Sequence, residues 1–321
     1  MISDEILLHN FSLNMKPSTL KSYSYRIAVL KKLFADAPLY KIITDKKSYN
    51  VLKSHTGSEN ASLANYITVI AKLFSSNKEL KGDTMYDFWR NHLKQEKIAE
   101  LDRYKENKPT EKQNANLIEY ETVFQKFKVL NDDPVVFHDK KNNLQFLLLA
   151  CLLNIRPKRA DFGNVRIVGE EDIDIYKDND KDKENYIVLS ESEPKLVLNV
   201  YKTAKKHSTI TEEINPVLYK IIKSSLEFYP RKYLFVDKEG KPYIKNNSYS
   251  QFVIRTFKSL FNINVGVSIW RHIYVSNKLN PTVMTTKELE REAFLMGHTI
   301  AQQSVVYRWV KGNETCECKC V

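Results

Sequence analysis

The chain has 321 residues, of which 42% are hydrophobic and 28% charged, so it can build folded cores and a wholly disordered protein is excluded. Lysine and arginine outnumber the acidic residues by 50 to 39, and the net charge of +11 makes a polyanion the expected partner. No run of about 18 apolar residues occurs, the N-terminus lacks a secretory signal, and four cysteines are too few for a disulfide scaffold. We therefore expect an intracellular protein of two domains without membrane contact, and nucleus or cytoplasm stays open.

The first predicted domain, residues 1–105, is a helical bundle. Apolar side chains recur at helical spacing from Leu20 to Phe34 and again from Leu63 to Phe74, which predicts two amphipathic helices. Only 8 glycines and 10 prolines interrupt the whole chain, which favours helices throughout. The polar faces of the two helices carry basic residues that can contact phosphates: Lys21, Arg26, Lys31 and Lys72.

A linker is predicted between the two domains. Residues 81–116 are rich in charge and poor in apolar positions, and we interpret their second half as the linker. Residues 106–130 then comprise this linker and the helix that leads into the second domain. The second domain occupies residues 131–321.

The second domain is predicted to be mainly α-helical with a small antiparallel β-sheet. Residues 144–153 are apolar nearly all round, which indicates a buried helix too short to cross a bilayer. Short β-branched runs follow at residues 164–168, 186–189 and 195–200, with an acidic insert at residues 172–184 between the first two. Helical patterns return after the sheet.

Four short islands in the second domain carry residues suited to chemistry on a phosphate. They are Asn154 to Phe162, Asn199 to Lys206, Val267 to His272, and Leu295 to Thr299 with Tyr307 nine residues after His298. Taken singly, each has an ordinary explanation, such as a helix-capping arginine, a lysine at a strand end or a half-buried tyrosine. Their joint occurrence in this order points instead to a common site.

In the order Arg, Lys, x-x-Arg, Gly-His, Tyr, the chain resembles the tyrosine recombinases, also called phage-type integrases. The resemblance covers nearly the whole chain, because the N-terminal helical pair with its Ser-Thr-Leu-x-x-Tyr start is similar to their DNA-gripping core-binding domain. The residues of three motifs are most similar to those of the recombinases of large DNA viruses and related mobile elements. These motifs are Arg159 to Val165, Tyr201-Lys202-Thr203 and Arg271-His272-Ile273-Tyr274.

The resemblance implies a site-specific DNA recombinase built as a two-domain clamp around double-stranded DNA. Such an enzyme cuts and rejoins DNA through a 3′-phosphotyrosyl bond and needs no metal, ATP or other cofactor. Four protomers on two paired DNA sites are the expected working assembly, and the chain alone in solution can be a monomer. The basic residues Lys158, Lys205 and Lys206 are further expected DNA contacts, since positive charge binds the phosphate backbone.

The chemistry of breaking a phosphodiester assigns the same roles. Tyr307 is the expected nucleophile, because an attacking phenolate can form the covalent link to phosphorus. Two arginines can stabilise charge on the non-bridging oxygens because their planar forks bind phosphate and keep their charge, and we assign Arg159 and Arg271 to this task. Lys202 is our candidate for protonating the leaving 5′ oxygen. His298 can bind the phosphate or orient the nucleophile.

One position departs from the family pattern. Ser268 stands where a histidine is usual, three residues before the second arginine, and a serine cannot take up a proton as imidazole does. Either Lys205, Lys206 or His272 compensates, or strand cleavage is slower. The general base is therefore left open.

Two further assignments stay open. The first arginine is Arg159 or Arg156, and Arg159 is preferred because Asp161 follows it by two residues, within the family's usual spacing of two or three. Trp309, two residues beyond the tyrosine, either packs beside its own helix or contacts a neighbouring molecule.

Two other functions are carried as alternatives. A type IB DNA topoisomerase shares the Arg, Lys, Arg, His and Tyr logic, but a small viral topoisomerase would show strands where this N-terminal domain is helical. A catalytically weakened DNA-binding relative is favoured by Ser268, whereas the presence of all five catalytic-type residues counts against it. The tail with Cys316, Cys318 and Cys320 is a poor metal site, and we expect it to dock on a neighbouring protomer.

Overall fold

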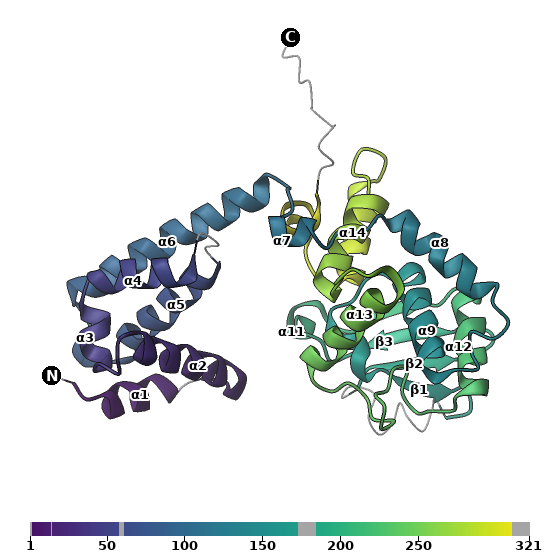
Figure 1. The fold of residues 1–321 in the computed structure, drawn as a ribbon, viewed down its shortest axis with the longest axis horizontal. Helices are drawn as coiled ribbons and strands as arrows, with labels where there is room; N and C mark the ends of the chain where they lie inside the picture. The colour runs from purple at the N-terminus through teal and green to yellow at the C-terminus, as the bar shows by residue number, and fades with distance from the viewer. Residues whose placement is uncertain (1, 14, 58–60, 173–183, 310–321) are drawn as a thin grey trace, which may run out of the picture. The chain divides into compact units, whose positions relative to one another are not determined.

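The computed structural model describes residues 2–13, 15–57, 61–172 and 184–309 (Figure 1). The chain divides into two units, Met1–Glu106 and Asn107–Val321. Most of the acidic insert and the tail with its three cysteines lie outside the described residues. No helix in the described ranges is long and apolar enough to cross a membrane.

The described part of the first unit consists of helices. They are α1 (Asp4–Ser12), α2 (Pro17–Leu33), α3 (Leu39–Thr44), α4 (Lys47–Thr56), α5 (Ala61–Ser76) and α6 (Thr84–Lys105), with a 3-10 turn at Lys78–Leu80. Helix α5 contacts α1, α2, α4 and α6, so its apolar face forms the centre of the core. The indole of Trp89 is fully buried there and donates to the Ile43 carbonyl at 2.7 Å. The two predicted amphipathic helices are confirmed as α2 and α5.

Helix α6 extends further than the charged composition of residues 81–116 indicated. It begins at the side chain of Asp83, which accepts a hydrogen bond from the Met85 amide at 2.8 Å, and it continues to Lys105. Glutamate and lysine are strong helix formers, and the Lys105–Asp102 ion pair at 2.8 Å supports the last turn. The predicted linker is therefore shorter than the second half of that stretch.

The second unit is built around α9 (Lys140–Asn154). Its residues from Asn143 to Leu152 are buried, which confirms the predicted buried helix. Helices α8 (Tyr120–Asn131) and α12 (Pro216–Phe228) pack on it, and a short α7 (Glu111–Asn114) precedes them. Asp139 begins α9 by accepting a hydrogen bond from the Asn142 amide at 2.8 Å.

The predicted small sheet is present, but its antiparallel character is only partly right. The strands β1 (Arg166–Gly169), β2 (Tyr186–Leu189), β3 (Lys195–Leu198) and β4 (Ile210–Glu213) pair in that order. Strands β2, β3 and β4 are antiparallel neighbours, whereas β1 pairs with β2 in parallel. A parallel pair needs a crossover of about a dozen residues or more, and residues 170–185 provide that length.

Strand β4 was not predicted from the sequence. Its burial alternates, with Ile210 and Glu212 buried and Thr211 and Glu213 exposed. A carboxylate at an inward position hides the hydrophobic alternation that identifies a half-buried strand. This inward carboxylate, Glu212, pairs with Lys158 and so connects β4 to the segment after α9.

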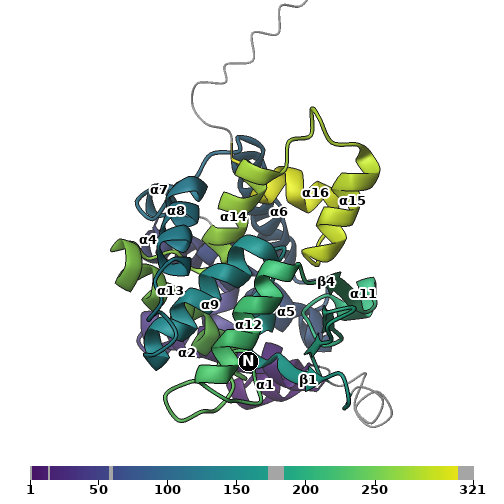
Figure 2. The same ribbon diagram turned by 90° about the vertical axis from the view of Figure 1, so that its right-hand side faces the viewer.

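Helix α11, between β3 and β4, and the helices that follow α12 bring the remaining islands together. They are α11 (Ala204–His207), α13 (Asn246–Phe261), α14 (Val267–Lys278), α15 (Thr286–Leu295), α16 (Ile300–Gln302) and a π-helical turn, Gln303–Tyr307. Figure 2 shows α14, α15 and α16 gathered on one side of the second unit, where α15 contacts β4 and α14 contacts the π-helical turn. A short 3-10 turn, Ala160–Asn164, follows Arg159.

Candidate active site

The candidate active site is organised by the turn that ends α15. The amide of Gly297 donates to the Phe294 carbonyl at 2.8 Å, and the amide of His298 donates to the Ala293 carbonyl at 3.0 Å. This pair of bonds is a Schellman motif, which requires a left-handed residue after the helix, and Gly297 supplies it with a φ of 69°. The glycine of the Gly-His island therefore fixes the direction in which His298 leaves the helix.

Both predicted phosphate-binding arginines bind carbonyl oxygens of this turn. Arg271 Nη1 donates to the carbonyls of Met296 and Pro157, each at 3.0 Å. Arg159 Nη1 donates to the Gly297 carbonyl at 3.1 Å. Carbonyl groups at a helix C-terminus lack intrahelical partners and attract cations, so the turn gathers two arginines that are distant in sequence.

The Arg271 guanidinium is buried with unused donors. The residue is only 1% exposed, and its Nε and Nη2 atoms have no hydrogen-bond partner among the described residues. Burial lowers the pKa of Arg271 to about 10, so the group still carries its charge at neutral pH. A buried cation with open donors is suited to an anionic ligand.

Tyr307 lies directly beside this cation. Its ring centroid is 4.7 Å from Arg271 Cζ, and the His298 ring stacks against it at 5.1 Å between centroids. Tyr307 is 8% exposed and His298 is 2% exposed. Tyr307 ends the π-helical turn, a local geometry that often occurs at functional sites. The structure thus brings together the predicted tyrosine, histidine and second arginine.

His272 and Trp309 support the backbone of Tyr307. His272 Nδ1 donates to the Tyr307 carbonyl at 3.2 Å, and its ring stacks on the Trp309 ring at 4.1 Å with an interplanar angle of 5°. Burial lowers the pKa of His272 to about 4, so the imidazole is neutral at pH 7 and a weak base. Trp309 therefore packs on a residue of its own chain, His272 of α14.

Lys202 occupies an exposed turn between β3 and α11 that reaches the same site. Its two neighbours both meet Gly297: Thr203 Oγ1 donates to the Gly297 carbonyl at 2.9 Å, and a methyl group on Gly297 would lie 3.5 Å from the Tyr201 ring. Lys205, in α11, is also exposed. The side chain of Lys206 lies outside the described part of the structure. Ser268 is exposed in the first turn of α14.

Arg156 and Lys158 have carboxylate partners instead of open donors. Arg156 binds Glu292 at 2.7 Å and Glu212 at 3.4 Å. The hydrogen bond to Glu292 raises the pKa of Arg156. The charge of Arg156 is thus engaged by two carboxylates and is not free for a phosphate. Arg159 thus fits the role of the first arginine better than Arg156.

The predicted DNA contact at Lys158 does not fit the structure. Lys158 is 4% exposed, and its ammonium group is paired with Glu212 and donates to the Leu295 carbonyl at 2.6 Å. A lysine enclosed in this way cannot reach a DNA backbone without breaking a buried ion pair. The sequence concealed this because Arg156 and Lys158, which pair with carboxylates, stand next to Arg159, which binds a carbonyl, and nothing local distinguishes them.

The basic residues predicted in the first unit lie on α2 and α5. Lys21 and Lys72 are exposed. Arg26 Nη1 donates to the carbonyl of Ser22 at 3.0 Å, one helical turn earlier. Lys31 pairs with Asp4 at 2.8 Å, and this hydrogen bond raises its pKa. Lys21 and Lys72 are thus the least engaged of the four.

Sequence reasoning missed three polar residues that shape the site: Thr203, Glu212 and Glu292. Glu212 could have been found from the spacing Ile210, Glu212, Ile214, which places it on the apolar side of a strand. Glu292 had no such signal, because an acid on a charged helix is normally solvated. No group of three or more His, Cys, Asp or Glu arranged for a metal ion occurs among the described residues.

Comparison with known proteins supports the architecture. No protein-family model matches the chain, and no curated protein matches it. The crystal structure of a lambda integrase dimer bound to a COC′ core site covers 94% of this chain and 77% of that chain, with a TM-score of 0.56 and 13% identity. The crystal structure of XerA recombinase covers 93% of both chains, with a TM-score of 0.39 and 12% identity.

The likeness to lambda integrase establishes the fold. The chain is mainly helical with a small mixed sheet in its second unit, and its fold is similar to that of the lambda integrase structure. The fold class implied by the sequence motifs is thereby confirmed. At 13% identity the likeness shows the fold alone, and the chemistry has to be argued from the site.

Proposed function

We propose that this chain is a site-specific DNA recombinase that breaks and rejoins strands through a 3′-phosphotyrosyl intermediate without metal or ATP. The observation that carries the proposal is the convergence on one helix-ending turn of Arg159, Arg271, His298 and Tyr307. The solved lambda integrase that shares the fold is a dimer bound to a COC′ core site, which supports DNA as the partner.

In the proposed reaction the Tyr307 hydroxyl loses its proton and its oxygen attacks the scissile phosphorus. A phenolic O–P bond forms, the P–O5′ bond breaks, and the leaving 5′ oxygen takes up a proton. The Nε and Nη2 donors of Arg271, together with Arg159, would hold the non-bridging oxygens as charge builds on them. Because the phosphodiester energy is kept in the tyrosyl bond, the reverse attack by a 5′ hydroxyl rejoins DNA without ATP.

Lys202 is the proposed donor of the proton to the leaving oxygen. It is exposed in this structure, yet Tyr201 and Thr203 anchor its turn to Gly297. A DNA backbone bound at the two arginines would meet this turn and cover the lysine. His272 does not replace the histidine that is absent at Ser268, because it is buried and engaged with the Tyr307 backbone.

Two rival functions make different predictions. The helical first unit favours a recombinase over a type IB topoisomerase, for which strands are expected there. Ser268 and the low basicity of His272 favour a slow or weakened relative, because the described site then lacks an imidazole at the usual base position.

We propose a tetramer on paired sites as the active assembly. The motif wording supports a source in a large DNA virus or a related mobile element.

The proposal is tested with supercoiled plasmid that carries the DNA flanking this gene, incubated with the protein in EDTA and without ATP. We expect a covalent protein–DNA band on denaturing gels, attached to the 3′ end of the DNA, together with recombinant products. The Tyr307→Phe variant should bind DNA with unchanged affinity and form no such band. Relaxed plasmid with no recombinants would favour the topoisomerase.

A matched control tests whether another exposed or half-buried phenol can substitute. Tyr201 lies beside Gly297 and its hydroxyl donates to the Ser208 carbonyl, so Tyr201→Phe should keep the covalent band. Salt-sensitive DNA binding without any covalent band from the wild-type protein would contradict the proposal and favour the non-catalytic relative.

A further inference from the structure

Three successive carbonyls at the end of α15 each accept a hydrogen bond from a different cation. Leu295 accepts from Lys158 at 2.6 Å, Met296 from Arg271 at 3.0 Å, and Gly297 from Arg159 at 3.1 Å. The second and third cations are the proposed phosphate ligands. The first cation, Lys158, is buried and belongs to a different network.

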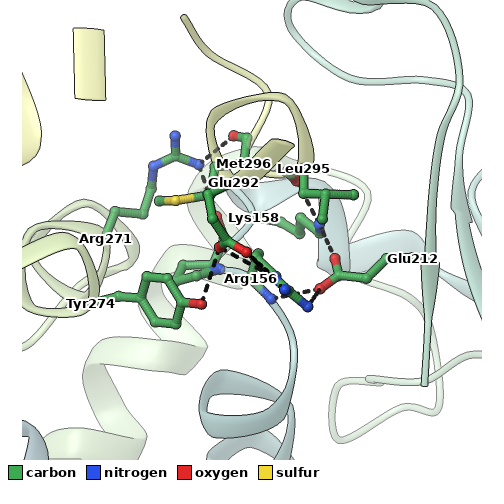
Figure 3. Close-up of polar contacts among 9 residues, drawn as sticks. Arg156, Lys158, Glu212, Arg271, Tyr274, Glu292, Leu295 and Met296 are labelled. Atoms are coloured by element: carbon green, nitrogen blue, oxygen red, sulfur yellow. Dashed lines mark hydrogen bonds and ion pairs between the residues drawn. The ribbon is translucent and has the colours of Figure 1, made fainter. Parts of the chain in front are cut away.

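This network is a chain of three ion pairs that one hydrogen bond to the backbone closes into a ring (Figure 3). Glu292 binds Arg156, Arg156 binds Glu212, and Glu212 binds Lys158. Lys158 then returns to α15 through the Leu295 carbonyl, three residues after Glu292 and on the same side of the helix. The ring joins three separate segments: the loop after α9, strand β4 and the last turn of α15.

The ring also contacts the helix that carries Arg271. The Tyr274 hydroxyl donates to Glu292 at 3.4 Å, and Tyr274 follows Arg271 by three residues on α14 (Figure 3). Two cations and two carboxylates balance within the ring, so it needs no outside ion. An ion network placed so close to the reacting groups is not required for burial alone, since apolar residues can fill such a space at equal or better stability.

We propose that Lys158, with Glu212, Arg156 and Glu292, is a positioning device that sets where the 295–297 carbonyls lie and thereby aims Arg271 and Arg159 at the scissile phosphate. Lys158 is a positioning residue that acts through the arginines and touches no DNA. This inference rests on the proposed function. It replaces the DNA contact expected for Lys158 with a specific structural task.

The test uses the full-length double variant Lys158→Met/Glu212→Gln. Both replacements keep side-chain size and remove one charge of each sign, so Arg156 and Glu292 remain balanced. Methionine cannot donate to the Leu295 carbonyl. We expect the single-turnover rate of covalent-adduct formation to fall about tenfold to a hundredfold, because small displacements of reacting groups have effects of that size. The dissociation constant for the same DNA should stay unchanged.

A modified substrate separates positioning from general loosening. At the phosphate mapped by the plasmid assay, a methylphosphonate replaces one non-bridging oxygen by a methyl group and removes the charge that the arginines stabilise. If Lys158 acts through Arg271 and Arg159, the rate loss of the double variant should shrink on this substrate to less than about threefold. An equal loss on both substrates would overturn the inference.

Arg231→Met is the matched control. Arg231 also donates to main-chain carbonyls of the second unit, those of Tyr229 at 2.8 Å and Leu234 at 3.1 Å, but to none in the 295–297 turn. It should lower the melting temperature and leave the cleavage rate unchanged where both proteins are folded. Should circular dichroism show the double variant unfolded, Glu292→Gln takes its place, with a rate loss of about threefold to tenfold expected.

The outcomes separate the two proposals. A wild-type protein that forms no Tyr307-dependent adduct overturns the proposed function and this inference with it. A wild-type protein that reacts while the folded ring variants react equally fast overturns the inference alone. A loss confined to the charged phosphate, with unchanged DNA affinity, supports both.

Discussion

The two sides of the 295–297 turn use the same kind of residue for opposite purposes. On one side Arg156 and Lys158 are neutralised by Glu212 and Glu292. On the other, Arg271 donates to two uncharged carbonyls and keeps two buried donors without a partner in the described chain. A carbonyl orients a guanidinium without cancelling its charge, whereas a carboxylate cancels it. The difference shows which cations are held for structure and which are held for a ligand.

The largest expected effect, on stability, comes from breaking the ion pair between Lys158 and Glu212. Glu212→Ala leaves Lys158 buried without its counter-charge, and we expect the free energy of unfolding to fall by about 3 to 5 kcal/mol. Urea denaturation at pH 7 measures this. Glu213→Ala is the matched control, because the carboxylate of Glu213, the next residue in the chain, is exposed and its removal should change stability little. Equal losses in the two variants would contradict the assignment.

The pH dependence of the Glu212→Ala variant gives an independent check. Burial already lowers the pKa of Lys158, and loss of Glu212 removes a group that raises it. Between the lowered folded-state pKa and the ordinary value of about 10.4, the unfolded chain binds more protons than the folded one. Stability should therefore rise with pH in this window, more steeply in the variant than in the wild type. A parallel pH profile for the two proteins would argue against a charged, buried lysine.

Arg271→Ala removes the arginine whose charge no carboxylate in the described ion pairs neutralises. The variant lacks the donors next to Tyr307, and we expect the rate of covalent-adduct formation to fall about a hundredfold to a thousandfold. Rapid-quench measurement with excess protein isolates this step from DNA binding. Arg255→Ala, in α13, removes an arginine outside the 295–297 turn and should leave the rate unchanged. A fall of less than about tenfold in Arg271→Ala would show that the open donors are not used.

His272 sharpens the comparison because it supports Tyr307 while uncharged. Its pKa of about 4 in the folded protein lies below the ordinary 6.5, so between these values the unfolded state binds more protons. The wild type should lose up to about 3 kcal/mol of stability as the pH falls from 6.5 to 4. His272→Asn keeps a donor for the Tyr307 carbonyl and removes the titration, so this part of the acid loss should disappear. Denaturation of both proteins across that range measures it.

The sequence predicted much of the candidate site but few of the residues that pack around it and hold it in place. The order of the four islands predicted Arg159, Arg271, His298 and Tyr307, because each island carries a residue type that phosphate chemistry needs, and these four residues lie together in the structure. The buried α9 was predictable from its continuous apolar pattern. The assignment of Lys158 failed because the difference between it and Arg159 is made by Glu212, a residue that reaches it only through the pairing of β4 with β3. Long-range partners of this kind have no local signal.

The parallel pairing of β1 with β2 was not predicted, for a related reason. Hydrophobic alternation says which residues face the core, but it does not say in which direction neighbouring strands run. That direction depends on the path of the intervening chain, and a long insert is compatible with either choice. The burial of His272 was likewise hidden, because the aromatic ring that covers it, Trp309, lies 37 residues further along the chain.

The smallest expected effect concerns the turn itself. In Gly297→Ala the added methyl group has room, 3.5 Å from the Tyr201 ring, so the cost is the left-handed backbone alone, about 1 to 2 kcal/mol. Gly240→Ala has the same kind of cost at a φ of 80° and meets nothing within 4 Å. Thermal unfolding should therefore show similar losses for both variants. Only Gly297→Ala should also slow covalent-adduct formation, because only that glycine carries the carbonyl that holds Arg159. Equal cleavage rates in the two variants would mean that the turn can shift without moving the arginines, and the two sides of the turn would then act independently.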